Sequence, residues 1–380
     1  YDEFDSLIYV SMIDRTVKFD LNWQANYNHN IKLGYLKISH NVDQQWRAIR
    51  NKYDGEASLS DIYKPEIFGD TTVFADLYKV EPQEGAAYLQ DKMEFDQMVI
   101  NMGLRFDYSD PNTVYPSQLR NPGNQLYFPS VDENGNIVTD SEGNIVLNEE
   151  RMSTYLKAAP QKQISPRIGI AYQLGEAALL RFSYGHFFQM PPYYALYDNN
   201  SFLVSPIDYD TKMGNPNIKA QKTIQYEVGF WQELNRNMTM EIALFYRDIY
   251  DLLGAKVITT YNQISYGLYS NKDYGNVRGV ELKYDYGMND LHIGMNYTLQ
   301  YTKGNANNPS STFDREGSQK DPIKRLIPMS WDQRHTANLA VGYNREKYGI
   351  TILGFYESGT PYTWEPISIS PLSSVNLYPN

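Results

Sequence analysis

The feature that most constrains the fold of this chain is a two-residue alternation that returns many times along it. Between Met98 and Tyr108, every second position carries a large apolar or aromatic side chain, and the positions between are mostly small, polar or charged. Successive side chains of a strand point to opposite faces, so this segment predicts a strand with one apolar and one wet face. The pattern recurs over 224–230 and 291–301. Such strands are typical of an all-β, transmembrane antiparallel β-barrel, with lipid outside and a hydrated lumen inside.

The phase of this alternation assigns a face to each residue. The outward set from Met98 also includes Ile100, Met102, Leu104 and Phe106, and Asn101 lies on the lumenal side. We expect Asp91, Lys92, Arg105 and Asp107 to face the lumen and to pair with each other or with a plug.

The composition agrees with a barrel and excludes several other classes. The chain has 380 residues, 34 of them tyrosine, whose apolar ring and polar hydroxyl suit a membrane interface. The formal net charge of -11 argues against nucleic acid as a partner. No run approaches the roughly eighteen apolar residues of a spanning helix. Tyr1 is not followed by the features of a signal peptide, so we expect a fragment of a longer protein.

The spacing of the candidate strands predicts hairpins. Expected partners are 88–94 with 98–108, 167–174 with 179–187, 223–234 with 238–248, 277–286 with 291–302, and 336–344 with 348–357, after strands at 16–24 and 31–39. Long polar loops are expected at 40–70, 109–165, 189–221, 250–276 and 303–333. Short turns on one side and long loops on the other are typical of outer-membrane barrels, whose long loops lie outside the cell.

Several short stretches carry a resemblance to a known family. They are 88–92, 102–108, 165–172, 214–219 leading into 226–229, 274–281 and 332–335. Through them, most of the chain resembles the TonB-dependent outer-membrane receptors, in particular the Bacteroidetes-type group. The resemblance implies part of a barrel of about twenty-two strands with a plugged lumen, with 1–380 forming barrel only and the plug and closing strands outside this chain.

The resemblance also implies an activity and its partners. Proteins of this family are active importers of large or scarce nutrients in the outer membrane of Gram-negative bacteria, where lipid surrounds the barrel and a TonB-type energy-coupling protein acts through the plug. One alternative is a passive porin, or a barrel scaffold in a surface or secretion complex with a surface lipoprotein as partner. An alternative of another class is a secreted all-β carbohydrate-binding module.

No motif predicts catalysis, a cofactor or a metal centre. The chain lacks HExxH, Walker and GxSxG patterns, and it has no cysteine to serve as a nucleophile. Its histidines show no spacing typical of metal ligands: they are His29, His40, His186, His292 and His335. The repeated segments 132–138 and 140–146 place carboxylates around a glycine, which suggests calcium, but a hairpin built on glycine turns is favoured because the closing glutamate of a calcium loop is missing.

One aromatic stretch is a candidate substrate site. Phe188, Tyr193, Tyr194 and Tyr197 follow a predicted strand into an external loop, and Pro191-Pro192 stiffens the backbone between them. Aromatic rings stack on flat ligands at low entropic cost, so this cluster is the candidate for substrate binding. The alternative, a membrane girdle with ordinary loop packing, is favoured over it by the sequence alone. In the stretch 274–281, Gly275 and Gly279 are expected to mark a bulge or a close approach where a strand begins.

Overall fold

The computed structural model describes residues 6–53, 64–206, 211–305, 308–310, 313 and 326–362, without the side chains of residues 272 and 273. The long strands are β1 (Ser6–Gln24), β2 (His29–Asn51), β5 (Gln83–Phe95), β6 (Met98–Asp110), β9 (Gln161–Gln173), β10 (Ala178–Gln189), β12 (Gln221–Asn235), β13 (Met238–Thr259), β14 (Ser265–Met288), β15 (Leu291–Gly304), β17 (His335–Arg345) and β18 (Tyr348–Glu357). The short elements are β3 (Pro65–Ile67), β4 (Ala75–Val80), β7 (Val114–Pro116), β8 (Tyr155–Lys157), α1 (Tyr193–Tyr197), β11 (Lys212–Met213) and β16 (Ile327–Pro328).

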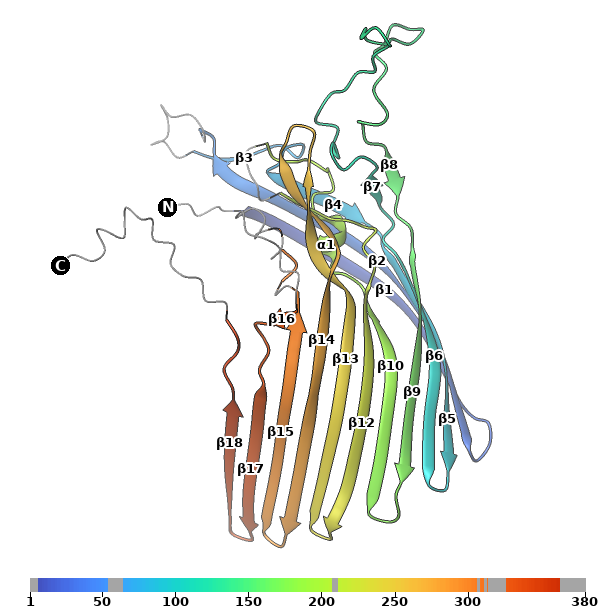
Figure 1. Ribbon diagram of the computed structural model, residues 1–380, viewed down its shortest axis with the longest axis vertical. Helices are drawn as coiled ribbons and strands as arrows, with labels where there is room; N and C mark the ends of the chain where they lie inside the picture. The colour runs from blue at the N-terminus through green and yellow to red at the C-terminus, as the bar shows by residue number, and fades with distance from the viewer. Residues whose placement is uncertain are drawn as a thin grey trace, which may run out of the picture.

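The long strands form a single curved sheet in which each strand lies antiparallel to its neighbour. Chain order and spatial order coincide from β1 to β18. Figure 1 shows the sheet as a curved wall with tight turns at its lower end and the long connections, α1 and β7–β8 at its upper end. Among the described strands, β1 and β18 each pair on one side only. The predicted hairpins and the predicted division between short turns and long connections are therefore present.

The outward face of the wall is apolar, as the alternation predicts. The ladder joins Leu21, Leu33, Leu89 and Leu104 across β1, β2, β5 and β6, and these side chains are 51%, 43%, 56% and 58% exposed. A row of exposed leucines is unfavourable in water and favourable in hydrocarbon. This row therefore lies where a barrel meets lipid.

An aromatic row crosses the same outward face farther along the sheet. Tyr184, Tyr226 and Tyr246 are register partners, with ring centroids 5.0 Å and 6.4 Å apart. The row continues through Arg278 to Tyr301, and the Arg278 guanidinium lies 6.0 Å from the Tyr301 ring. Such a belt is the arrangement expected of an interfacial girdle.

Two predicted loops are wrong in their extent. The segment 250–276 is not a loop, because β13 and β14 continue through it and close a hairpin at 260–264. Similarly, β2 continues to Asn51 through the predicted loop 40–70. Outside the membrane both faces of a strand are exposed to water, so its apolar residues no longer alternate with polar ones. The backbone hydrogen bonds between the strands continue nevertheless.

The glycines of the 274–281 stretch also lie elsewhere than predicted. Gly275 and Gly279 stand inside β14 and not at its start. The register between β13 and β14 is irregular from Ile249 to Leu252, beside Gly275. A Cβ on Gly279 would overlap the Leu299 carbonyl and the Phe245 ring. The predicted bulge and close approach are present, but within the strand.

The repeated segments 132–138 and 140–146 form two similar tight turns. The Asp132 carboxylate accepts hydrogen bonds from the Asn134 and Asn136 amides at 2.9 Å and 2.8 Å, and Asp140 caps the second turn in the same way. Gly135 has a φ of 84°, which favours glycine. The carboxylate oxygens thus cap their own turns, as the hairpin prediction requires.

No helix in the described ranges is long and apolar enough to cross a membrane.

Candidate functional site

The predicted aromatic site lies around α1, at the end of the sheet that carries the long connections (Figure 1). The helix packs into a buried apolar cluster shared by several strands and loops. Its members are Val42, Tyr78, Val80, Ala195, Leu196, Tyr197, Ile218, Ala255, Tyr269 and Phe313. The long connections at this end of the wall are therefore packed on one another, which gives this end an ordered surface.

The stretch 214–219 holds α1 in place. The Gly214 amide donates to the Asp198 carbonyl and the Asn215 amide to the Ala195 carbonyl, both at 2.8 Å. A Cβ on Gly214 would come within 2.6 Å of the Tyr197 nitrogen, so this approach requires glycine. One of the short stretches noted in the sequence is thereby explained by packing.

The three predicted tyrosines of α1 have different environments. Tyr197 is 1% exposed, and its hydroxyl donates a 2.8 Å hydrogen bond to the Pro111 carbonyl. Tyr193 is half-buried, and its ring meets the His40 ring edge-on at 5.9 Å. Tyr194 is 40% exposed and rests its edge on Tyr269 at 5.5 Å. Tyr194 is thus the tyrosine of this helix that is open to a ligand.

The structure separates Phe188 from these tyrosines. The β10–β12 register places Phe188 on the same face as Phe182 and Tyr184, which is the outward face. The preceding residue, Phe187, lies on the lumenal face, where the Arg167 guanidinium stands 4.8 Å from its ring. Strand parity with Arg181 and Ser183 could have identified Phe187 from the sequence.

Two carboxyl groups lie close together beside α1. Asp76 of β4 accepts a 2.9 Å hydrogen bond from the Asn199 amide, and its other oxygen is buried with no hydrogen-bond partner among the described residues. Burial, and then the charge of Asp76, raise the pKa of Asp198 to about 7. Burial also raises the pKa of Asp76. Asp198 can therefore hold a proton near neutral pH, and it lies outside the spanning part of the wall.

His40 lies next to Tyr193, which packs against the apolar cluster around α1. Its Nδ1 is 2.7 Å from a carboxylate oxygen of Asp14, and its side chain is 7% exposed. The Nε2 atom lies 3.9 Å from Glu84, too far for a hydrogen bond. In the part of the chain that the structure describes, no group of His, Asp and Glu is arranged to hold a metal ion.

Several charged side chains on the lumenal face of the wall form ion pairs. Arg105 Nε lies 2.8 Å from Asp107, as predicted, and Lys18 Nζ lies 2.8 Å from Asp20. Other pairs on this face join Lys92 with Glu94, Arg181 with Glu241, and Lys283 with Asp285.

The prediction that Asp91 and Lys92 share the lumenal face is wrong. Adjacent residues of a strand point to opposite sides, and the register sets Asp91 opposite Met102, on the outward face. The Asp91 carboxylate is 2.7 Å from His29 Nδ1, so it pairs there and not with a lumenal group.

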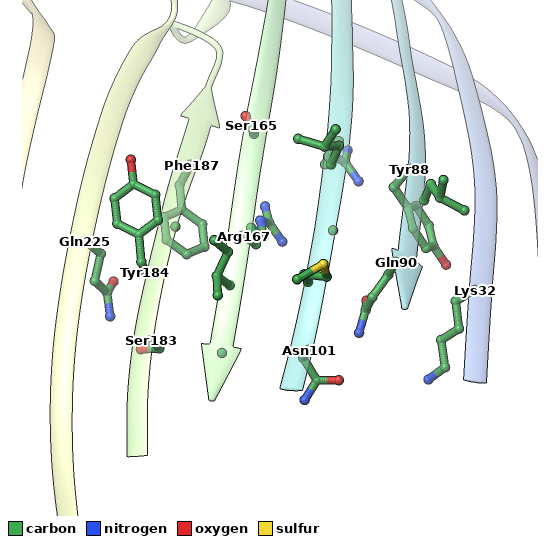
Figure 2. Close-up of a pocket in the computed structure, with 18 residues that line it drawn as sticks. Lys32, Tyr88, Gln90, Asn101, Ser165, Arg167, Ser183, Tyr184, Phe187 and Gln225 are labelled. Carbon is green, nitrogen blue, oxygen red and sulfur yellow. The ribbon is translucent and has the colours of Figure 1, made fainter. Parts of the chain in front are cut away.

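A hollow of about 510 Å³ lies in the lumenal wall across β2, β5, β6, β9, β10 and β12. Gly103 and Gly185 stand on either side of Arg167 in one ladder row, and Gly169 lies in the next row. The absence of side chains at these positions leaves the space open. Figure 2 shows the labelled lining, with Arg167 beside Phe187 and with Lys32, Tyr88 and Gln90 contributed by β2 and β5 on the far side of β6. The alternation alone does not reveal this hollow, because it depends on the register of separate strands.

Comparison with protein families gives a match over nearly the whole chain. The family model described as TonB dependent receptor-like, beta-barrel matches residues 3–376. No curated protein is significantly similar to the chain in sequence.

Solved structures share the fold at low sequence identity. The FrpB iron transporter from Neisseria meningitidis is 11% identical with a TM-score of 0.51, covering 90% of this chain and 42% of its own. The haemophore receptor HasR from Serratia marcescens, solved with its haemophore HasA and haem, is 12% identical with a TM-score of 0.56, covering 93% and 53%. The Escherichia coli outer membrane transporter YddB is 12% identical with a TM-score of 0.53, covering 89% and 40%. The chain thus spans about half or less of the length of these proteins.

Proposed function

The chain belongs to the TonB-dependent receptor family, which lies in the outer membrane of Gram-negative bacteria, and we propose that it is part of an active importer. The family is one of transporters and not of enzymes. In this proposal a large or scarce nutrient binds at the external loops. A TonB-type protein in the periplasm then supplies the energy through a plug in the lumen.

The observation that carries the proposal is the contrast between the two faces of one wall. The outward face bears rows of exposed leucines and interfacial tyrosines, whereas the inward face carries paired charges around a glycine-lined hollow. Such a wall suits a wide, hydrated lumen and not a small barrel filled by its own side chains.

Within this proposal, Tyr194 is the residue of the predicted site that contacts substrate. Tyr193 and Tyr197 hold the helix that presents Tyr194, and Phe188 belongs to the outward face. Some structural neighbours are named as transporters of iron or copper or as a haemophore receptor. Metal chelates are therefore the first substrates to test.

Energy dependence is the decisive measurement for the proposed transport. Uptake of ferric chelates, haem and copper complexes should be compared in cells with and without the TonB protein. We expect uptake of at least one of them to stop when TonB is removed. Uptake that continues unchanged without TonB indicates a passive porin.

Binding tests the role of Tyr194 separately. Tyr194→Ala should weaken binding of the transported chelate by about 1 kcal/mol, the scale of one aromatic contact. Tyr127→Ala is the matched control, because Tyr127 is a 60% exposed loop tyrosine that is not part of the apolar cluster around α1. Equal loss of affinity in both variants would remove Tyr194 from the site.

A further inference from the structure

The hollow in the lumenal wall has an electrostatic character that sets it apart from the rest of this face. Its lining includes Lys32, Arg105 and Arg167, and it includes no Asp or Glu. The whole chain carries a formal charge of -11, so this concentration of cations is not a property of the composition. Low-dielectric walls around charges of one sign strengthen the potential that they create.

Two of these cations have no partner of opposite charge in the described part of the chain. Arg105 is paired with Asp107, but no carboxylate lies within ion-pair distance of Arg167 or Lys32. Arg167 instead lies over the Phe187 ring, 4.8 Å from its centroid, which orients the guanidinium and leaves its N–H donors available. Elsewhere on this face, lysines such as Lys18 and Lys283 do have carboxylate partners.

A buried hydroxyl in the lining independently indicates a missing ligand. Ser165 is 0% exposed and lines the hollow, and its Oγ has no hydrogen-bond partner among the described residues. Buried hydroxyls are rarely left without a partner. In the sheet register Ser165 lies beside Arg105, one ladder row from Arg167.

Aromatic rings line the hollow, among them those of Tyr88 and Phe187, and the position of the Tyr88 ring is fixed by its contacts. The Tyr88 hydroxyl donates a 2.8 Å hydrogen bond to Asp20, and the ring passes over Gly34, where a side chain would collide with it. Phe187 forms another wall (Figure 2). A volume of about 510 Å³ accommodates a small organic ligand.

We propose that this hollow is a binding site for a carboxylate group. The carboxylate accepts hydrogen bonds from Arg167 and Ser165 while Lys32 adds charge, and in a free solute a flat apolar body joined to the carboxylate lies against Phe187 and Tyr88. The carboxylate can come from a free solute in the lumen or from an acidic side chain of a polypeptide that occupies the lumen. The inference uses the lumen of the proposed importer but does not depend on energised transport.

Phenylacetate is a suitable probe, and phenylacetamide is its neutral counterpart. Binding of both to the full-length receptor in detergent micelles is measured by titration calorimetry, and the melting temperature of each variant is recorded. The variants are Arg167→Gln, Arg167→Lys to retain the charge, and Lys283→Gln as a control that removes a lumenal cation outside the hollow. Lys32→Gln serves as a second test if Arg167→Gln fails to fold.

The results separate the two sources and can overturn the proposal. If the carboxylate comes from a free solute, the receptor binds phenylacetate more tightly than phenylacetamide. Arg167→Gln then weakens the binding of phenylacetate about tenfold, and Lys283→Gln does not. If the carboxylate belongs to a polypeptide in the lumen, the receptor binds phenylacetate and phenylacetamide equally. Among the variants, Arg167→Gln alone then lowers the melting temperature, and Arg167→Lys keeps the original value. If Arg167→Gln behaves like Lys283→Gln in both measurements, the hollow is not a carboxylate site. Neither measurement requires TonB, so failure of transport and failure of this site are distinguishable.

Discussion

Arginine placed in the leucine row provides a direct test of which face meets lipid. Leu104 is 58% exposed in β6 and lies beside Leu89 in the ladder, so Leu104→Arg sets a guanidinium into hydrocarbon. Asn101→Arg is the matched control, since Asn101 lies on the lumenal face of the same strand. Met102 is a poorer choice, because its register partner Asp91 offers a carboxylate to the new guanidinium.

The expected magnitudes differ enough to be resolved. Arginine on the lipid face of a barrel costs about 2–4 kcal/mol near the bilayer midplane, and less toward the interfaces. The same residue on the wet face should change the free energy of unfolding by no more than about 0.5 kcal/mol, as for surface substitutions in general. The predicted difference between the variants is therefore about 2 kcal/mol or more.

Unfolding in phospholipid vesicles measures this difference. The receptor is titrated with guanidinium chloride, and the fluorescence of its tryptophans, five of which lie in this chain, reports unfolding. Equal unfolding free energies for the two variants, or a larger loss for Asn101→Arg, would refute the assignment of faces.

Three further predictions concern the end of the sheet that carries the long connections. Protease added to intact cells should cut within 134–144, whose exposed turns lie in the connection between β6 and β9; cleavage only at 235–237 would reverse the topology. Asp198 has a raised pKa of about 7, so the folded state keeps a proton that the unfolded state loses above about pH 4. The stability of the α1 region should therefore fall as the pH rises from 4 to 7 and then level off, and hydrogen exchange should show this. A pH slope as steep in Asp198→Asn as in the unmodified protein would contradict it, since only the smaller contribution of Asp76 remains in that variant. Tyr197→Phe should destabilise the α1 cluster by about 1 kcal/mol by removing the hydrogen bond to Pro111, with thermal melting as the measurement and an unchanged midpoint as the contrary result.

The alternation of side chains is a local property of the chain, and for that reason much of the wall can be predicted from it. A strand such as 98–108 reveals its two faces through a period of two, and turn residues mark where it reverses. The hairpin partners, the outward leucines and the short turns at one end follow from these signals. The Arg105–Asp107 pair follows as well, because residues two apart on a strand share a face.

The extent of the strands outside the membrane and the composition of each site depend on contacts between distant segments. The sequence predicts a loop over 250–276, because apolar residues do not recur at every second position there. The pairing of β13 with β14 nevertheless continues through it. Tyr197 and Tyr194 are alike in the sequence, but the packing of α1 buries the first and exposes the second. The hollow around Arg167 arises only when Gly103 and Gly185 become its neighbours across two strand pairs. Strand register and tertiary packing decide these features, because a local period carries no information about which distant residues become neighbours.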